Sequence, residues 1–509
     1  MLYQSPIVQE IETPMITESI RPITSRHATR LAITLLTAFL SLRDAAAAPF
    51  TVQGPGVNSN DFRTTTFASG LDFPLGMARL SDGSLLVAIS QGANLFNSTG
   101  KLIRLVDANE DGIADGPGAV LYSNLPGAQT SLRVEGNLVF VTGQSKPITV
   151  LRAGNSASDP LTFVGQLIIN YPQGGWLHPN SALGSRKTPG QTNRYDLLFQ
   201  LGSSDNFSVT TRTATFTQTN IPGANATLSG DGIHWLTIAD HGTNVTATPP
   251  TPLATGLRNP AGFAFHPATG DLYFQDNGID GLVNANEPHS ADELNFIART
   301  NLGGVAEYFG FPSNYISYRT NTFVGGMGVS PLIAFQPLPN PFTGAESEGP
   351  NDIVFAPPGF PDGLNTGVFL GFHGKFNGGG TNNEENPLVY ANPATGAYFH
   401  FIAGQQPGIG HLDGLLATRD SLFVADLVTG GNTGSGAGQG VIYQIKSLVN
   451  PTLPTLSARA VDSQIELVWD RGVLQAADAL TGPWNAVEDA FSPHLIQPAA
   501  PRRFYRTGY

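Results

Sequence analysis

A short acidic segment carries oxygen-bearing side chains at a spacing that suits a metal ion. Counted from the first residue, these side chains stand at positions one, three, five and nine: Asp107, Asn109, Asp111 and Asp115. Gly112 at position six allows a sharp turn, and the backbone carbonyl of Ile113 at position seven offers one more oxygen. Ca²⁺ binds such sets of oxygen ligands. The segment therefore predicts a calcium loop.

The acidic segment departs from an EF-hand at two points. Position twelve holds Gly118, where an EF-hand has a glutamate, and the preceding KLIRLV has the pattern of a strand rather than a helix. We therefore expect a stand-alone structural calcium loop within a sheet. An acidic surface turn without metal is the alternative.

The elements that must position such loops recur along the chain. Six apolar runs of strand length lie beside turn residues: SLLVAIS after Asp82-Gly83, NLVFVTG after Glu135-Gly136, YDLLFQLG at 195–202, DLYFQD after Thr269-Gly270, NTGVFLG at 365–371 and SLFVADL after Arg419-Asp420. Such runs suit strands packed on both faces, and the turn pairs tolerate positive φ. With 59 Gly and 38 Pro, the pattern predicts an all-β fold, a six-bladed β-propeller. The stretch Phe67–Leu71 is expected to close the ring with the last blade.

The two ends of the chain differ in composition from the middle. The apolar run 31–42 follows basic residues and precedes the alanines 45–48, the order of a secretory signal, so residues 1–48 are interpreted as a lead-in and signal peptide. Export to the periplasm or the extracellular space is expected, with no membrane span in the mature chain; a retained N-terminal anchor is the alternative. Residues 49–450 are assigned to the propeller. Pro451 and Pro454 mark a linker, and 451–509 is expected to form a small β-rich module for attachment, folding or surface display.

Composition excludes several classes of function. The chain has no cysteine, so disulfides, thiolate metal sites and cysteine nucleophiles are excluded. Its formal net charge is -13 and no basic stripe is present, which argues against a nucleic-acid partner. No motif of a serine hydrolase or zinc protease occurs.

Several segments together resemble one enzyme family. They are LRNPAGFAFHPATGDLYFQDNGID at 257–280, SADELNFI at 290–297, GMARLSDGSLLVA from Gly76, YFGFP at 308–312 and NDIVFAPPGFP at 351–361. These segments are similar to the soluble PQQ-dependent glucose dehydrogenases and the related aldose sugar and sorbosone dehydrogenases, over about Phe67–Lys446. The resemblance implies a six-bladed propeller that holds PQQ and Ca²⁺ and oxidises a sugar by hydride transfer, with an external electron acceptor.

The resemblance also implies roles for particular residues. Arg258 and Asn259 match a pair that contacts the quinone, and Lys375 lies near a lysine that does the same. Asn277 stands where the family has a glutamine, and the carbonyls of Gly278 and Ile279 stand where the family binds the cofactor's calcium. His411 stands near the position of arginines that help to bind PQQ. Cationic side chains suit its three carboxylates.

The remaining role is that of a general base for the sugar hydroxyl. His178, ahead of YDLLFQLG, occupies roughly the position of the family's catalytic histidine, and His373 and His411 are further candidates near the axis. The predicted function is a PQQ- and calcium-dependent sugar dehydrogenase. A non-catalytic propeller that binds carbohydrate or protein is the first alternative, and a calcium-dependent lactonase is the second.

Overall fold

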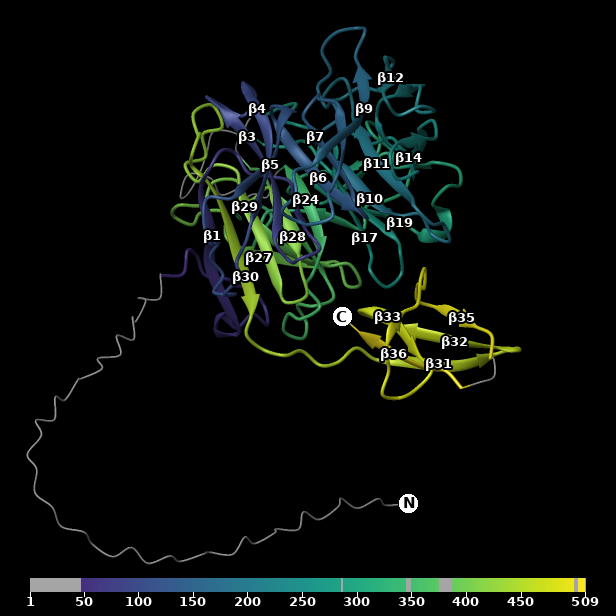
Figure 1. The fold of residues 1–509 in the computed structure, drawn as a ribbon. Coiled ribbons are helices and arrows are strands. Elements are labelled where there is room, and N and C mark those ends of the chain that lie inside the picture. Colours follow the sequence, from purple (N-terminus) through teal and green to yellow (C-terminus); the bar gives the residue numbers. More distant parts are fainter. Residues whose placement is uncertain (1–46, 285–286, 345–348, 375–386, 499–501, 509) are drawn as a thin grey trace, which may run out of the picture. The chain divides into compact units, whose positions relative to one another are not determined.

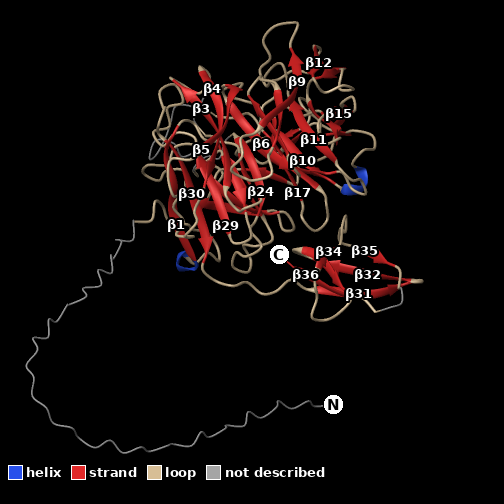
Figure 2. Ribbon diagram, viewed as in Figure 1, coloured by secondary structure: helices blue, strands red, loops and turns tan. Residues whose placement is uncertain are grey.

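The computed structural model describes residues 47–284, 287–344, 349–374, 387–498 and 502–508. Over these residues the chain consists almost wholly of strands, and its helical segments are two short 3₁₀ turns, η1 (Ser59–Asp61) and η2 (Arg299–Asn301) (Figure 2). The predicted all-β class is confirmed. No helix in this part of the chain is long and apolar enough to span a bilayer.

Each of the six repeated sequence units forms the second strand of a separate sheet. In the second and the last of these sheets, every residue of the second strand (138–143 and 421–426) is buried, as expected for strands packed on both faces. The second strands are β3 (Leu85–Gly92), β7 (Leu138–Gly143), β11 (Arg194–Leu201), β18 (Leu272–Asp276), β25 (Val368–Phe372) and β29 (Ser421–Asp426).

The first strand of each sheet lies next to the axis of the molecule. These strands are β2 (Met77–Arg79), β6 (Gln129–Glu135), β10 (Leu183–Lys187), β17 (Pro260–Phe265), β24 (Pro350–Phe355) and β28 (Gly414–Ala417). Each contacts the first strand of the next sheet in chain order, and β28 contacts β2. The six sheets therefore follow one another in a ring of contacts as the blades of a propeller. Figure 1 shows β3 and β5 of the first blade beside β1 and β29 of the last.

The outer strands differ in number between sheets. From the first blade to the last, they are β4 (Ser98–Leu105) and β5 (Ala119–Pro126); β8 (Ile148–Arg152), β9 (Thr162–Asn170), β12 (Thr213–Thr219) and β13 (Ala226–Ser229); β14 (Gly232–Asp240), β15 (Val245–Ala247), β16 (Thr251–Thr255) and β20 (Glu307–Tyr308); β19 (Asp292–Ile297) and β23 (Ile333–Phe335); β26 (Leu388–Asn392) and β27 (Ala397–Ile402); and β30 (Gly440–Ser447) with β1 (Phe62–Leu71). A separate hairpin pairs β21 (Tyr315–Ile316) with β22 (Phe323–Val324).

The last blade contains both ends of the propeller segment. β1 pairs with β30 in antiparallel register, from Phe62 opposite Ser447 to Leu71 opposite Gly440. The expected pairing of Phe67–Leu71 with the last blade is therefore observed, and the strand begins five residues earlier than expected. This pairing covers the outer edge of β30.

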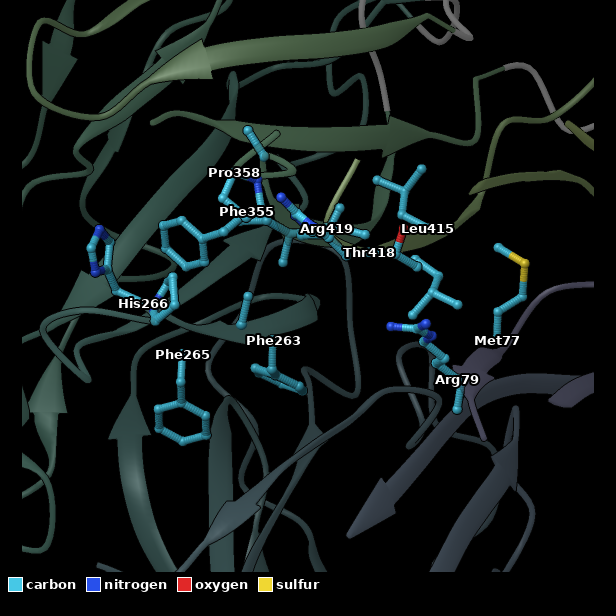
Figure 3. A pocket seen from close by; sticks show the side chains of 18 of the residues that line it. Met77, Arg79, Phe263, Phe265, His266, Phe355, Pro358, Leu415, Thr418 and Arg419 are labelled. Atoms are coloured by element: carbon cyan, nitrogen blue, oxygen red, sulfur yellow. The ribbon is translucent and has the colours of Figure 1, made fainter. Parts of the chain in front are cut away.

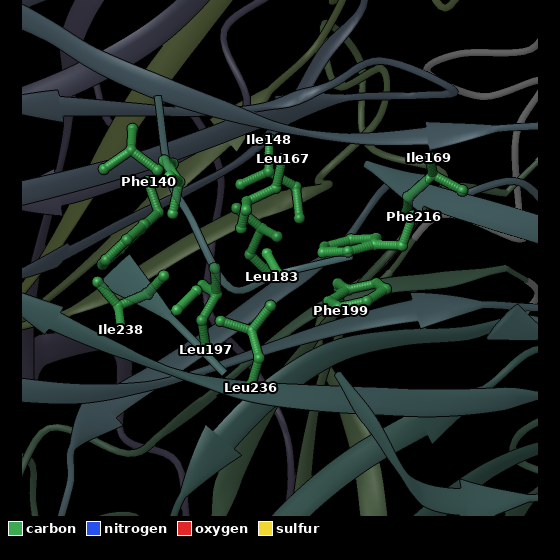
Figure 4. Close-up of a cluster of buried hydrophobic side chains, with 14 of the residues drawn as sticks. Phe140, Ile148, Leu167, Ile169, Leu183, Leu197, Phe199, Phe216, Leu236 and Ile238 are labelled. Atoms are coloured by element: carbon green, nitrogen blue, oxygen red, sulfur yellow. The ribbon is translucent and has the colours of Figure 1, made fainter. Parts of the chain in front are cut away.

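The cores lie between neighbouring blades. One cluster joins the blade of β7 to the blade of β11, and its buried side chains include Phe140, Ile148, Leu183, Leu197, Phe199 and Phe216 (Figure 4). The Phe199 and Phe216 rings stack with centroids 5.1 Å apart. Truncating Phe199 to alanine would cost about 3–5 kcal/mol, because the ring is fully buried and the blades cannot close over the space.

The C-terminal residues form two further antiparallel sheets of three strands. One contains β31 (Leu456–Val461), β32 (Gln464–Trp469) and β35 (His494–Ile496), and the other contains β33 (Val473–Ala477), β34 (Asn485–Ala486) and β36 (Phe504–Gly508). Their small core contains Leu467, Trp469 and Leu474. The structure thus has β-rich segments after residue 451, where the sequence indicates a module.

Candidate functional site

A cavity of about 250 Å³ lies at the end of the axis where the first strands begin. Each of the six blades contributes a residue that precedes or opens its first strand: Leu75, Thr130, Ser181, Asn259, Asn351 and Asp413. His178, Asn277 and His373 also line this space, which we call the histidine cavity. Polar side chains from five of the six blades thus line one space.

His178 reaches the cavity from the loop between β9 and β10, because its backbone is held on both sides. Its N–H donates to the Ser203 carbonyl (3.0 Å), and its carbonyl accepts the Gly202 N–H (3.1 Å). The Ser203 N–H in turn donates to the carbonyl of Arg258 (2.6 Å). A Cβ at Gly202 would lie 2.5 Å from the Arg258 carbonyl oxygen and 2.8 Å from the His178 Cβ, so only glycine permits this close approach.

The His178 ring carries an unused hydrogen-bonding group. Its Nε2 is buried and has no hydrogen-bond partner. Burial, reinforced by the nearby positive charge of Arg258, lowers the pKa of His178 to about 3. The ring is therefore neutral at every physiological pH and presents either a free acceptor or a free donor to a ligand.

Arg258 lies behind the cavity wall, and its side chain is only 3% exposed. Its guanidinium forms an ion pair with Asp280 (2.6 Å) and donates to Asn206 Oδ1 (2.8 Å). The predicted quinone contact therefore already has a countercharge. No Arg or Lys side chain lines the cavity within the described ranges.

A buried carboxylate fixes the backbone beside Asn259. Asp276, at the end of β18, accepts the N–H groups of Arg258 (3.0 Å) and Asn259 (2.7 Å). Burial raises the pKa of Asp276 to about 7, although these two hydrogen bonds act in the opposite direction. Asp426, at the end of β29, accepts the N–H groups of Gly410 (2.8 Å) and His411 (2.9 Å) in the same way. Two blades thus use the last residue of the second strand to hold the loop before the first strand.

Asn277 connects two blades across the cavity. Its side-chain N–H₂ donates to the carbonyls of Asn259 (3.1 Å) and Pro350 (3.0 Å). The following two residues, predicted as calcium ligands, are held by their N–H groups: Gly278 donates to Asp292 (2.7 Å) and Ile279 donates to Ser290 Oγ (2.7 Å).

The Ile279 carbonyl accepts the N–H groups of His289 (2.6 Å) and Ser290 (3.3 Å). It has little capacity left for a metal ion, so a calcium role for Ile279 stays a prediction without geometric support. Gly278 and Ile279 nevertheless lie next to Asn277, as the sequence resemblance implies.

His373 forms the one charged pair of the cavity wall in the part of the chain that the structure describes. Its Nδ1 lies 3.0 and 2.9 Å from the two oxygens of Asp413, whose side chain is fully buried. Burial disfavours the imidazolium, but the Asp413 charge outweighs it and raises the pKa of His373. The same pairing keeps the pKa of Asp413 below its ordinary value despite burial. The cavity therefore contains a hydrogen-bonded imidazole–carboxylate pair in which Asp413 favours the protonated form of His373.

His411 supports His373 from behind and does not line the cavity. The two rings stack at 4.3 Å with an interplanar angle of 4°. Nδ1 of His411 faces the His373 carbonyl (2.5 Å), and Nε2 faces the Gly431 carbonyl (3.1 Å). A cofactor contact of His411 would therefore act through His373. Lys375, the other predicted contact, lies outside the described residues.

Asp413 is the functional residue that sequence reasoning did not assign. The only signal was an acidic residue two positions after His411 in a turn that leads into a buried strand. Its partner His373 stands forty residues earlier, so nothing in the local sequence couples the two.

The predicted calcium loop joins β4 to β5. Its carboxylates accept backbone N–H groups of the loop itself: Asp107 from Gly112 (2.9 Å), Asp111 from Ile113 (2.9 Å) and Asp115 from Ala108 (2.7 Å). No group of three or more His, Asp or Glu side chains is arranged to hold a metal ion anywhere in the described ranges. The four predicted side-chain ligands Asp107, Asn109, Asp111 and Asp115 therefore stay predictions.

The same loop packs on the strand that closes the ring. Thr65 Oγ1 donates to the Gly112 carbonyl (2.7 Å), and the Arg63 guanidinium donates to the Glu110 carbonyl (3.1 Å). The Ala114 N–H donates to the Phe67 carbonyl (2.8 Å). The loop thus ties the first blade to β1.

Comparison with known proteins supports the fold. No family model matches the chain. The curated relative with a match is an uncharacterized protein of Borreliella burgdorferi, 45% identical over 60 residues, and the match spans 12% of this chain and only 14% of that protein.

Among solved structures, the calcium structure of Trichoderma reesei Carbohydrate-Active Enzymes Family AA12 covers 79% of this chain and 98% of its own, with 16% identity and a TM-score of 0.51. Also similar is the holo PQQ domain of Coprinopsis cinerea pyranose dehydrogenase, with 16% identity, coverage of 79% of this chain and 99% of its own, and a TM-score of 0.48. The PQQ-bound aldose sugar dehydrogenase of Streptomyces coelicolor has 17% identity, covers 76% of this chain and 98% of its own, and has a TM-score of 0.46. At these sequence identities the similarity concerns the fold alone. The fold of this chain is similar to that of the AA12 protein over 79% of its residues.

Proposed function

We propose that the protein is a PQQ-dependent dehydrogenase that oxidises a hydroxyl group of a sugar in the histidine cavity. One observation carries the proposal: a single cavity on the axis is lined by His178, Asn259 and Asn277. The sequence predicts a role in oxidation for all three, and they come from two distant segments of the chain. The cofactor comes from the sequence resemblance, and the similar fold of a carbohydrate-active enzyme supports a carbohydrate substrate.

The chemistry of the cavity wall suits a flat ring system rich in oxygen and nitrogen. The unpartnered His178 Nε2 and the side chains of Thr130, Gln144 and Asn351 offer hydrogen bonds around the space. His373 supplies positive charge to a carboxylate of the cofactor, and Arg258 adds a longer-range contribution from behind. PQQ, when bound, accepts the two electrons that leave the sugar carbon as hydride.

Two histidines of this chain then take different roles in proton transfer. Oxidation of an alcohol to a carbonyl releases one proton from the hydroxyl oxygen, and the neutral His178 Nε2 is the acceptor for it. Asp413 favours the protonated form of His373, and in that form the ring is the donor to electron-rich oxygen. Two groups whose pKa values are displaced in opposite directions thus take the basic and the acidic role.

Further expectations complete the proposal. Ca²⁺ binds the Asp107–Asp115 loop as a structural ion and the Gly278 region with the cofactor. An external electron acceptor reoxidises the cofactor. The signal-like N-terminus places the enzyme in the periplasm or outside the cell, with the C-terminal module as a means of surface association.

A second candidate function is binding of a sugar without oxidation. It is favoured by the ion pair of Arg258 with Asp280, which leaves the wall with less free positive charge than three carboxylates would use. The two candidates differ in one property, which is affinity for PQQ.

Titration with PQQ distinguishes them. Trp176 lies two residues from His178, its Nε1–H donates to the Gly202 carbonyl (2.8 Å), and it is one of four tryptophans, so its emission reports on the cavity. Residues 49–509 should show saturable quenching by PQQ in Ca²⁺, and Trp176→Phe should remove most of it. Saturable binding of sugars without any quenching by PQQ would replace the dehydrogenase with the second candidate.

A further inference from the structure

A second and larger cavity, of about 640 Å³, lies where the first strands end. Five blades contribute the last residue of their first strand, Arg79, Glu135, Phe265, Phe355 and Ala417, and the blade of β10 contributes Ser185 from the middle of that strand. Since the histidine cavity is lined by the beginnings of the same strands, the two cavities lie at opposite ends of the axis. The volume falls within the ~300–1,000 Å³ of small-molecule sites.

The deep wall of this cavity is apolar. Met77, Leu132, Phe263, Ile353 and Leu415 line it and are almost completely buried. Figure 3 shows Phe263, Phe355 and Leu415 around the same space as the side chains of two arginines. An apolar ligand placed here would gain about 0.8 kcal/mol for each CH₂ group that leaves water.

The two arginines, Arg79 and Arg419, are exposed and come from different blades. Within the described ranges, neither guanidinium forms an ion pair or a hydrogen bond with another residue. We call the space the arginine cavity. Unpaired cations are unexpected in a chain with 39 acidic and 26 basic residues.

The other charged groups of the wall already have partners. Arg133 pairs with Asp352 (3.2 Å), and Glu135 accepts a hydrogen bond from Ser185 (2.8 Å). Asp470, in the turn Asp470–Val473 that completes the lining, pairs with Arg471 (3.2 Å). Among the described residues, the charged groups of this cavity without an ion-pair partner are therefore the cations Arg79 and Arg419 and the carboxyl group of Glu135, which leaves an excess of positive charge.

From this combination we infer that the arginine cavity binds an amphiphilic carboxylate, an alkyl chain that ends in an anionic head group. The chain lies along the apolar ends of the first strands, and the head group takes hydrogen bonds from the two guanidinium groups, which match a carboxylate in geometry and charge. The site shares no lining residue with the histidine cavity and is independent of the proposed oxidation.

Binding of the fluorescent fatty acid cis-parinaric acid to residues 49–509 tests this inference. We expect saturable binding of the fluorescent fatty acid. Decanoate should displace it at concentrations at least about tenfold lower than those that decanol requires, because only the carboxylate of decanoate pairs with the arginines. Arg79→Gln with Arg419→Gln should weaken the binding of decanoate at least about tenfold and abolish its advantage over decanol.

Two controls keep the result interpretable. Arg503→Gln changes an exposed arginine of the C-terminal sheets and should leave binding unchanged. Unchanged far-ultraviolet circular dichroism of the double variant would show that it folds. Equal affinity for decanoate and decanol in the parent chain, or undiminished binding of decanoate to the folded double variant, would overturn the inference.

Discussion

The histidine cavity and the arginine cavity are formed by opposite ends of the same six strands, yet they are built by different means. At the beginning of the strands, buried carboxylates hold the backbone of the residues that carry the polar side chains. Asp276, for example, accepts the backbone N–H groups of Arg258 and Asn259. At the end of the strands, apolar side chains form the wall and two arginines stay exposed.

This difference indicates two modes of binding. The histidine cavity is organised in advance by hydrogen bonds, so a change there should alter stability and geometry together. The arginine cavity depends on apolar area and on two arginines that have no partner among the described residues, so changes at these arginines should alter affinity and little else.

Among changes at the two cavities, removal of the His373 ring should produce the largest loss of stability. His373→Gln leaves the fully buried Asp413 without its counterion, and we expect the free energy of unfolding in urea to fall by about 3 kcal/mol. His241→Gln is the matched control, because His241 is exposed and its ring bonds only Thr246 among described side chains. Equal losses in the two variants would contradict a charged pair at the cavity.

A methyl group at Gly202 should separate the loops that meet behind His178. Gly202→Ala places Cβ against the backbone of Arg258, which we expect to cost about 1–3 kcal/mol in urea unfolding and to change the emission of Trp176. Gly175→Ala lies in the His178 loop with nothing within 4 Å of the added atom, so it should be nearly neutral. A neutral Gly202→Ala would show that the loops are not held in contact.

The buried His178 ring should make stability depend on pH. Its pKa of about 3 in the folded chain lies below the ordinary 6.5, so unfolding takes up a proton between these values and the free energy of unfolding falls as pH decreases. From pH 7 to pH 5 this group alone should account for about 2 kcal/mol. His178→Gln should reduce the difference in stability between pH 7 and pH 5 by that amount; an unaltered difference would place the ring in water.

In the chain without cofactor, removal of calcium should act through the 107–115 loop, away from both cavities. If the 107–115 loop binds Ca²⁺, addition of EDTA should lower the free energy of unfolding by about 1 kcal/mol, because the loop holds the ring-closing strand β1. Asp107→Asn with Asp111→Asn should abolish the effect of EDTA, while Asp159→Asn, in another surface loop, should preserve it. An unchanged melting temperature in EDTA would favour an acidic turn without metal.

The smallest effect is expected at the rim of the arginine cavity. Arg79→Gln and Arg419→Gln should each change the free energy of unfolding by no more than about 0.5 kcal/mol, since neither guanidinium has a partner in the part of the chain that the structure describes. A loss as large as that of His373→Gln would remove the contrast between the two ends of the axis.

The repeated strands could be predicted from sequence because their pattern is local. Each apolar run with its turn became the second strand of a blade, and the segment from 257 to 280 brought Asn259 and Asn277 to the axis as the resemblance implied. The first strands of all six blades begin at the same end of the axis because each blade repeats the same order of strands.

Pairings between distant segments could not be predicted. Asp413 neutralises His373 across forty residues, and Asp280 neutralises Arg258 from a turn that carries no sign of this contact in its sequence. The arginine cavity was equally hidden, because Arg79 at the end of β2 and Arg419 in a turn are single basic residues far apart in the sequence, and only the ring brings their blades together.

Turnover by the variant that lacks the proposed base tests the central claim most directly. Residues 49–509 loaded with PQQ and Ca²⁺ should reduce a dye in the presence of at least one aldose from a broad panel. His178→Gln should reduce kcat at least about a hundredfold while quenching of Trp176 by PQQ is preserved, and His241→Gln should match the parent. Undiminished turnover in His178→Gln, or no turnover by the loaded parent with any sugar, would contradict the account.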